Sequence, residues 1–206
     1  TAGAFTNFCA TAMIGDYVNT IALNGTKVLV GGKFTTVDGS TRNRIAEVDT
    51  NCDVTTWNPG ANGIVTSLVV SGSTVYVGGL FTTLSTSTRN YFGALTLDVA
   101  SSYVQSLNPS PDALVSSLYL YGSTLYVGGS FTSFGGSTRY RAAAISTAGV
   151  LQSWAPFFNS TVSALSVDST NIYAGGAFTM GGASARSNLA AFSASAGTLS
   201  TFAPNP

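Results

Sequence analysis

Acidic side chains are the residues of this sequence best suited to acid–base chemistry, because it contains no histidine. Without histidine, a Ser-His-Asp triad and a His-ligated zinc site are both excluded. A glycosidase instead needs two carboxyl groups that face each other across the scissile bond. Asp38 and Asp112 could lie on one face of the fold, but nothing in their spacing shows that they converge. We therefore expect no enzyme and no catalytic residue, with a carboxylate-dependent glycoside hydrolase kept as an alternative.

The segment Asp49-Thr50-Asn51-Cys52-Asp53 has the D-x-N-x-D spacing of oxygen ligands in a calcium loop. Val54 stands where such a loop needs its sharp-turn glycine, and the bidentate glutamate farther along is missing. An Asx turn accounts for the same residues, since Asp and Asn side chains commonly bond to nearby backbone amides. We expect no metal site and no cofactor.

Four arginines stand at matching positions, each shortly after a Phe-Thr pair. They are Arg42, Arg89, Arg139 and Arg186. A ring of guanidinium groups could bind an anion. A residue that serves every repeat is better explained by the fold, with each guanidinium donating to backbone carbonyls of its own Phe-Thr loop. We expect the same structural role for the recurring aromatic residues Phe34, Phe81, Phe131, Phe178, Trp57 and Trp154.

These residues belong to a repeat of about 47 to 50 residues that occurs four times. Each copy carries a Gly-Gly pair, then Phe-Thr, then the arginine, and later a bulky residue shortly before a proline. The Gly-Gly pairs are Gly31-Gly32, Gly78-Gly79, Gly128-Gly129 and Gly175-Gly176. No helix or P-loop lysine follows these pairs, so they indicate close strand packing or a bulge and not a phosphate cradle.

Each copy contains short β-branched or aromatic runs bounded by turn residues, as strands do. Four strands in a unit of this length predict an all-β propeller with four blades, each a four-stranded antiparallel sheet. The blades would span residues 18–64, 65–114, 115–161 and 162–206, and residues 1–17 would cover a blade edge. The innermost strands would pack through Val18, Val65, Val115 and Val162, with Ile21, Leu68, Leu118 and Leu165.

We expect the fourth unit to pack on the first and close the ring, because the repeats account for the chain to its end. Four consecutive blades of a longer array are the alternative.

The repeat resembles a known family. Residues 125–133 (LYVGGSFTS), 41–44 (TRNR) and 57–59 (WNP) are similar to the delta-sixty type β-propeller repeats. Such repeats occur in large secreted or surface-attached bacterial proteins, and related ones occur in a fungal cortical polarity marker. The resemblance implies a propeller and an exported setting, and it supplies no catalytic residue. Leu107 departs from it by replacing the tryptophan of the second unit, and Ser187-Asn188 departs from it in the fourth.

Charged residues make up only 8% of the chain, and eight Lys and Arg balance eight Asp and Glu. We expect no nucleic-acid partner, because phosphate binding needs a basic stripe. We also expect no membrane insertion, since no apolar run approaches the roughly 18 residues of a spanning helix. Low charge and abundant Ser, Thr and Gly favour an extracellular or cell-surface protein. We expect the chain to be a processed product or an excised domain, with neighbouring domains of a longer chain as partners. In that setting Cys9 and Cys52 would form a disulfide.

Function on a propeller lies in its loops. The connections after the second and fourth strands of each unit should share one face, which gathers hydroxyl, amide and aromatic side chains. The candidate ligand-binding residues there are Asp38, Asn58, Tyr91, Asn108, Asp112, Tyr140, Phe157 and Phe158. Such a face favours a non-enzymatic recognition or adhesion module for a neutral glycan or a protein surface. A purely architectural spacer is the alternative.

Overall fold

The computed structural model describes residues 14–51, 53–98 and 103–204 of the chain. Within these ranges the regular structure consists of strands, and no helix is long and apolar enough to cross a membrane. Cys9, Cys52 and residues 1–13 lie outside the described residues. The disulfide and the covering role of the N-terminal segment therefore stay predictions.

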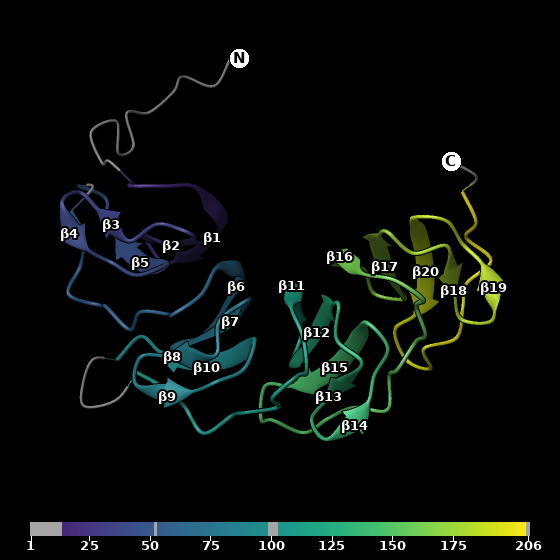
Figure 1. Ribbon diagram of the computed structural model, residues 1–206. Helices are drawn as coiled ribbons and strands as arrows, with labels where there is room; N and C mark the ends of the chain where they lie inside the picture. The colour runs from purple at the N-terminus through teal and green to yellow at the C-terminus, as the bar shows by residue number, and fades with distance from the viewer. Residues whose placement is uncertain (1–13, 52, 99–102, 205–206) are drawn as a thin grey trace, which may run out of the picture.

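The strands form four similar antiparallel sheets, ordered β1-β2-β5, β6-β7-β10, β11-β12-β15 and β16-β17-β20 from the inner strand outwards (Figure 1). The inner strands are β1 (Val18–Asn24), β6 (Val65–Ser71), β11 (Val115–Tyr121) and β16 (Val162–Val167). The second strands are β2 (Lys27–Gly32), β7 (Thr74–Gly79), β12 (Thr124–Gly129) and β17 (Asn171–Gly176). The third strands are β5 (Ile45–Val48), β10 (Phe92–Thr96), β15 (Ala142–Ser146) and β20 (Leu189–Ser193).

The fourth strand of each sheet is reduced to one bridging residue. These bridges join Val48 to Val54, Leu95 to Val104, Ile145 to Leu151 and Phe192 to Leu199. Four such antiparallel sheets confirm the predicted all-β propeller blades. We refer to them as units one to four.

A two-stranded hairpin follows the second strand of every unit. These hairpins are β3 (Thr36–Val37) with β4 (Ser40–Thr41), β8 (Thr83–Leu84) with β9 (Ser87–Thr88), β13 (Ser133–Phe134) with β14 (Ser137–Thr138), and β18 (Met180–Gly181) with β19 (Ser184–Ala185). The phenylalanine before each hairpin is fully buried. Those residues are Phe34, Phe81, Phe131 and Phe178.

Neighbouring units pack through glycine on one side and valine on the other. A Cβ atom added to Gly78 would lie 2.6 Å from Cγ1 of Val115 in unit three, so no side chain fits there. Gly31 stands in the same way against Val65, and Gly128 against Val162. The first glycine of each of these pairs thus allows adjacent sheets to approach closely, while the second lies against backbone of its own unit, as Gly79 does against the Ile64 carbonyl.

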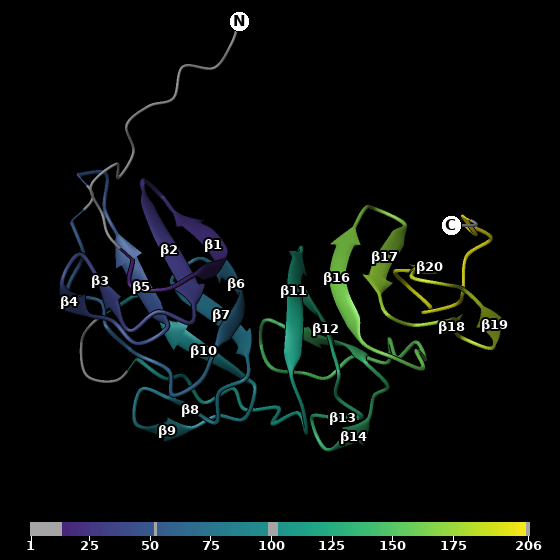
Figure 2. The same cartoon turned by 45° about the horizontal axis from the view of Figure 1, so that its top comes forward.

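The prediction of a closed ring is wrong. Figures 1 and 2 show the four units as an arc, with units one and four at its two ends. The inner-strand residue Ile21 of unit one is 67% exposed, whereas its equivalent Leu68 in unit two is 5% exposed. Val18 is exposed as well, so neither residue packs as expected. The repeat gives the number of blades, but it does not give the angle between them, and that angle decides closure.

The repeat extends before Val18. Ile14 bridges to Val37 as Ala61 bridges to Leu84 in the next unit. Residues 14–17 therefore form the entry to unit one, as the linkers do for the later units.

Candidate binding site

The short hairpins and the linkers between units lie on one face, which we call the loop face. Ala61 in the first linker bridges to Leu84 of the β8–β9 hairpin, and Phe158 in the third linker bridges to Gly181. The connections after the second and fourth strands are thereby brought together, as the strand order predicts.

Asp112 has a structural role on this face. Its carboxylate accepts hydrogen bonds from the amides of Thr132 and Ser133, at 2.7 and 3.0 Å, and from the Thr132 hydroxyl. Partial desolvation opposes ionisation, but these hydrogen bonds outweigh it and hold the pKa of Asp112 below its usual range. Asn62 and Asn159 make the equivalent bonds in units two and four. The carboxylate therefore holds its hairpin in place, and its role in ligand binding stays a prediction.

Phe158 is also structural. It is 1% exposed and packs against Phe178 and Phe192, with ring centroids 4.7 and 5.2 Å away. Its partner across the bridge is Gly181, where the other units have Val37, Leu84 and Phe134. A large side chain in the linker thus compensates for a missing one in the hairpin. The prediction that Phe158 meets a ligand is wrong because this volume exchange places it in the core.

The neighbouring Phe157 remains exposed and stacks edge-to-face on Tyr140, with ring centroids 5.3 Å apart. The equivalent pairs in the earlier units are Asn43 with Gly60 and Asn90 with Ser110. Among the described residues, unit three therefore presents an aromatic pair where the other units present small polar groups. This pair is available for a ligand.

The other candidate residues are dispersed. Asp38 occupies the tip of the β3–β4 hairpin with a left-handed φ of 48°, and Asn58 bonds through its amide to the Thr41 carbonyl. Tyr91 is half-buried against the core between units two and three. Asp38 belongs to unit one and Asp112 caps a hairpin of unit three, with unit two between them (Figure 2).

The repeated arginines hold each hairpin to the outer strand of its own unit. Arg89 donates through one terminal nitrogen to the Thr88 carbonyl at 2.8 Å, and through the other to the Gln105 carbonyl at 2.6 Å. The remaining three make the same pair of bonds. One acceptor of each arginine is thus the last residue of the loop that follows its Phe-Thr pair, as expected, and the other acceptor lies in the outer strand of the same unit.

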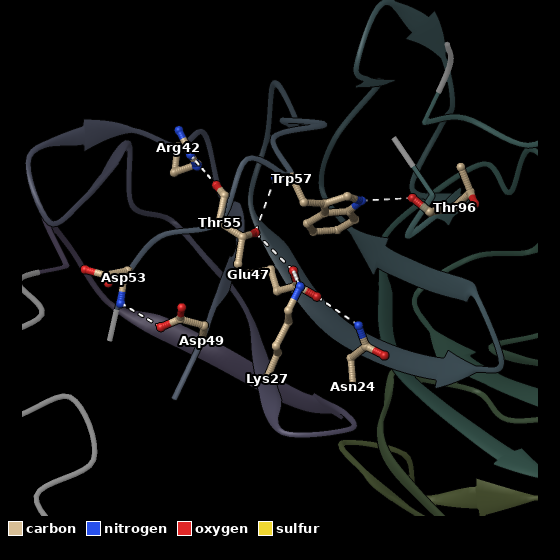
Figure 3. A network of polar contacts seen from close by, with 9 residues as sticks. All are labelled: Asn24, Lys27, Arg42, Glu47, Asp49, Asp53, Thr55, Trp57 and Thr96. Atoms are coloured by element: carbon tan, nitrogen blue, oxygen red, sulfur yellow. Dashed lines mark hydrogen bonds and ion pairs between the residues drawn. The ribbon is translucent and has the colours of Figure 1, made fainter. Parts of the chain in front are cut away.

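Figure 3 shows the polar network of unit one around Glu47. This carboxylate is 3% exposed and accepts hydrogen bonds from Asn24, Lys27 and Thr55, at 2.9, 3.0 and 3.0 Å. Units two to four have alanine at this position, so nothing in the repeat indicated a buried acid. In the same view Asp49 accepts from the Asp53 amide at 3.0 Å, and it also accepts from the Asn51 amide. The Asp49 carboxylate, one of the oxygen ligands of the candidate calcium loop, therefore belongs to an Asx turn.

A pocket of about 680 Å³ opens between units two and three at Leu107. Its polar lining includes Ser106, Asn108, Ser110, Ser133 and Thr147, and none of its lining residues carries a charge. In unit one the equivalent position holds Trp57, which is buried against unit two. In unit three it holds Trp154, which is buried against unit four. The shorter Leu107 leaves the corresponding space open.

The departure of Leu107 from the repeat was visible in the sequence, but its consequence was not. Of the candidate residues, Asn108 lies in the pocket. Gly149, on the opposite wall, comes within contact of Leu107, just as Gly197 does of Trp154. The wall that accommodates an indole elsewhere is thus retained here.

Comparisons with known proteins agree with the fold. Residues 27–51 match a family model described as a domain of unknown function (DUF5122) beta-propeller. A search of curated proteins found no match. The computationally designed Ika8 protein is 12% identical with a TM-score of 0.59, covering 90% of this chain and 48% of its own. The designed Ika4 protein is 14% identical with a TM-score of 0.58, covering 86% of this chain and 91% of its own. The chain thus spans about half the length of the Ika8 chain.

Proposed function

We propose that this chain is a non-enzymatic recognition module of an exported protein, and that the pocket at Leu107 binds a neutral saccharide. The observation that carries the proposal is an uncharged pocket lined by hydroxyl and amide groups, at the one described inter-unit contact where leucine stands in for a large aromatic residue. The resemblance of the repeats to the delta-sixty type supports an extracellular or cell-surface setting.

The chemistry of the lining favours a sugar over an ion. Ser, Thr and Asn side chains donate and accept hydrogen bonds, as the hydroxyl groups of a saccharide do. An ionic ligand would need an opposite charge or a dipole to offset its desolvation, and the lining contains no charged side chain. Leu107, Ile145 and Leu151 supply an apolar floor for the face of a sugar ring.

The carboxylates support a role in binding over one in hydrolysis. Asp112 is occupied by its hairpin, and Asp38 lies on the hairpin of another unit. Neither is among the residues that line the pocket.

A binding profile on an array of neutral oligosaccharides tests the proposal. A reproducible class of bound sugar is expected. Leu107→Trp should place an indole in the pocket and abolish that binding, while Phe157→Ala, which alters the exposed aromatic pair instead, should leave it unchanged. If Phe157→Ala abolishes binding and Leu107→Trp does not, the site lies at the aromatic pair.

The architectural alternative has its own support, because the recurring polar groups of the loop face all serve the fold. Under that alternative the array is blank for the wild-type protein, and Leu107→Trp changes only stability.

A further inference from the structure

The chain carries the two complementary halves of its own inter-unit interface, one at each end of the arc. In the three internal interfaces, a glycine of one unit meets a valine of the next. The amide of the following inner-strand leucine then donates back to a hydroxyl. Leu118 donates to Ser67 at 3.0 Å, and Leu165 donates to Ser117 at 3.2 Å.

Unit one exposes the valine side of this interface. Its inner strand presents Val18, Ile21 and Leu23, with Ile21 and Leu23 67% and 69% exposed. The matching residues of unit two, Val65 and Leu68, are buried against unit one. A row of aliphatic side chains that is buried or partly buried in every other unit is thus open to solvent.

Unit four exposes the glycine side. The nearest atom to a Cβ added at Gly175 is 3.9 Å away, whereas the equivalent glycines meet a valine at 2.6 to 2.8 Å. Leu189 and Phe202 are exposed nearby in this unit, and Phe202 packs on Tyr173 as Trp154 packs on Tyr126. The face that would receive the next inner strand is thus present but uncovered.

We propose that a second copy of this chain fills both ends. Unit one of each copy would dock on unit four of the other, so that two arcs close one ring of blades. The occupant follows from continuity, since the two free faces belong to the same interface that already joins the units in sequence.

One substitution distinguishes this contact from the internal ones. Ala164 of unit four replaces the hydroxyl residues Thr20, Ser67 and Ser117. The Ile21 amide of the second copy would therefore lack the side-chain acceptor that Leu118 and Leu165 have. We expect an interface weaker than the internal ones, with a dissociation that can be measured.

Sedimentation velocity of the full chain over a micromolar concentration series gives the primary test. The expected result is a species of twice the 21.0 kDa chain mass. A monomer throughout the series overturns the proposal, and so does a growing series of larger species, since an interface that fails to close makes open filaments.

Two variants test the orientation. Ile21→Asp places a charge on the exposed face of unit one, and Gly175→Val adds a side chain to the glycine face of unit four, where an added Cβ atom lies 3.9 Å from its nearest neighbours. Both should fold and raise the dimer Kd at least about tenfold. Val150→Asp is the matched control, because Val150 is 62% exposed on a turn of unit three, away from both end faces, and should leave the Kd unchanged.

A mixture of the two variants makes the test specific. Each mixed pair retains one intact interface, formed by unit one of the Gly175→Val chain and unit four of the Ile21→Asp chain. Mixed dimers should therefore form where neither variant dimerises alone. If Ile21→Asp dissociates the dimer and Gly175→Val does not, the contact joins two copies of unit one, and the head-to-tail proposal is wrong.

Discussion

The indole nitrogen of Trp57 donates a hydrogen bond to the carbonyl oxygen of Thr96 in the next unit, at 2.8 Å. Trp154 makes the same bond to Ser193, at 3.2 Å. The acceptor is in each case the last residue of the third strand, and its equivalent opposite Leu107 is Ser146. Each tryptophan thus joins the outer strand of one unit to the third strand of the next, and Leu107 cannot supply that bond.

Leu107→Trp should raise the free energy of unfolding by about 1–2 kcal/mol, because it buries an indole and restores a hydrogen bond to Ser146. Gly149 leaves room for the ring, as Gly197 does for Trp154. Urea unfolding measures the change. The reciprocal variant Trp57→Leu should cost about 2–4 kcal/mol by opening the same cavity between units one and two. A less stable Leu107→Trp would show that the pocket cannot accept an indole.

Arg89→Ala should lower the free energy of unfolding by about 1–3 kcal/mol, since the Thr88 and Gln105 carbonyls lose a charged donor. Chemical denaturation gives the value. Lys33→Ala is the control, because Lys33 is half-exposed and makes a 3.5 Å ion pair to Asp16 and a cation–π contact with the Tyr17 ring, and it should cost less than about 1 kcal/mol. Equal stabilities of the two variants would contradict a structural role for the arginine.

Asp168 should titrate near its pKa of about 2, because the amides of Thr170 and Asn171 donate to its carboxylate and the Tyr173 hydroxyl adds a further bond. Since the folded pKa lies below the unfolded value of 3.8, its contribution to stability is complete above 3.8 and is lost as pH falls through about 2. Carbon-detected NMR follows the carboxyl group directly. Tyr173→Phe should raise the midpoint only partly, because both amides remain; a wild-type midpoint near 3.8 would refute the assignment.

The blades were predictable from the sequence because the repeat places equivalent residues in equivalent environments. Each Gly-Gly pair and each Phe-Thr phenylalanine occupies the same place in its unit, so periodicity was sufficient. Ring closure was not predictable in this way, because the angle between sheets depends on the summed packing of their side chains. Ile21 and Leu68 occupy equivalent positions in the repeat, and they differ only in whether another unit packs against them.

The candidate site was less predictable, because it depends on departures from the repeat. The sequence does not show that Phe158 lies opposite Gly181, and this pairing is what places its ring in the core. Asp112 shares its role at the hairpin with two asparagines at the same linker position. Leu107 lines the pocket, but the sequence alone does not show that a leucine at this position leaves one. That consequence follows from the contacts that Trp57 and Trp154 make with the adjacent unit. The sequence shows that Leu107 departs from the repeat, and the structure shows the pocket that results.

Glu47→Ala should destabilise the protein by about 1–3 kcal/mol, even though the other units have alanine at this position. The loss arises because Asn24, Lys27 and Thr55 are arranged around a buried carboxylate, and none keeps its acceptor when it is removed. Lys27 is partly exposed and can regain water, so a double-mutant cycle with Lys27→Thr, the residue of unit two, should give a coupling of only about 1 kcal/mol. Thermal and urea unfolding of the four proteins of the cycle provide the measurement. Additive effects would mean that the ion pair with Lys27 contributes nothing and that Glu47 acts through Asn24 and Thr55 alone. An unchanged free energy of unfolding for Glu47→Ala would show that the network does not stabilise unit one.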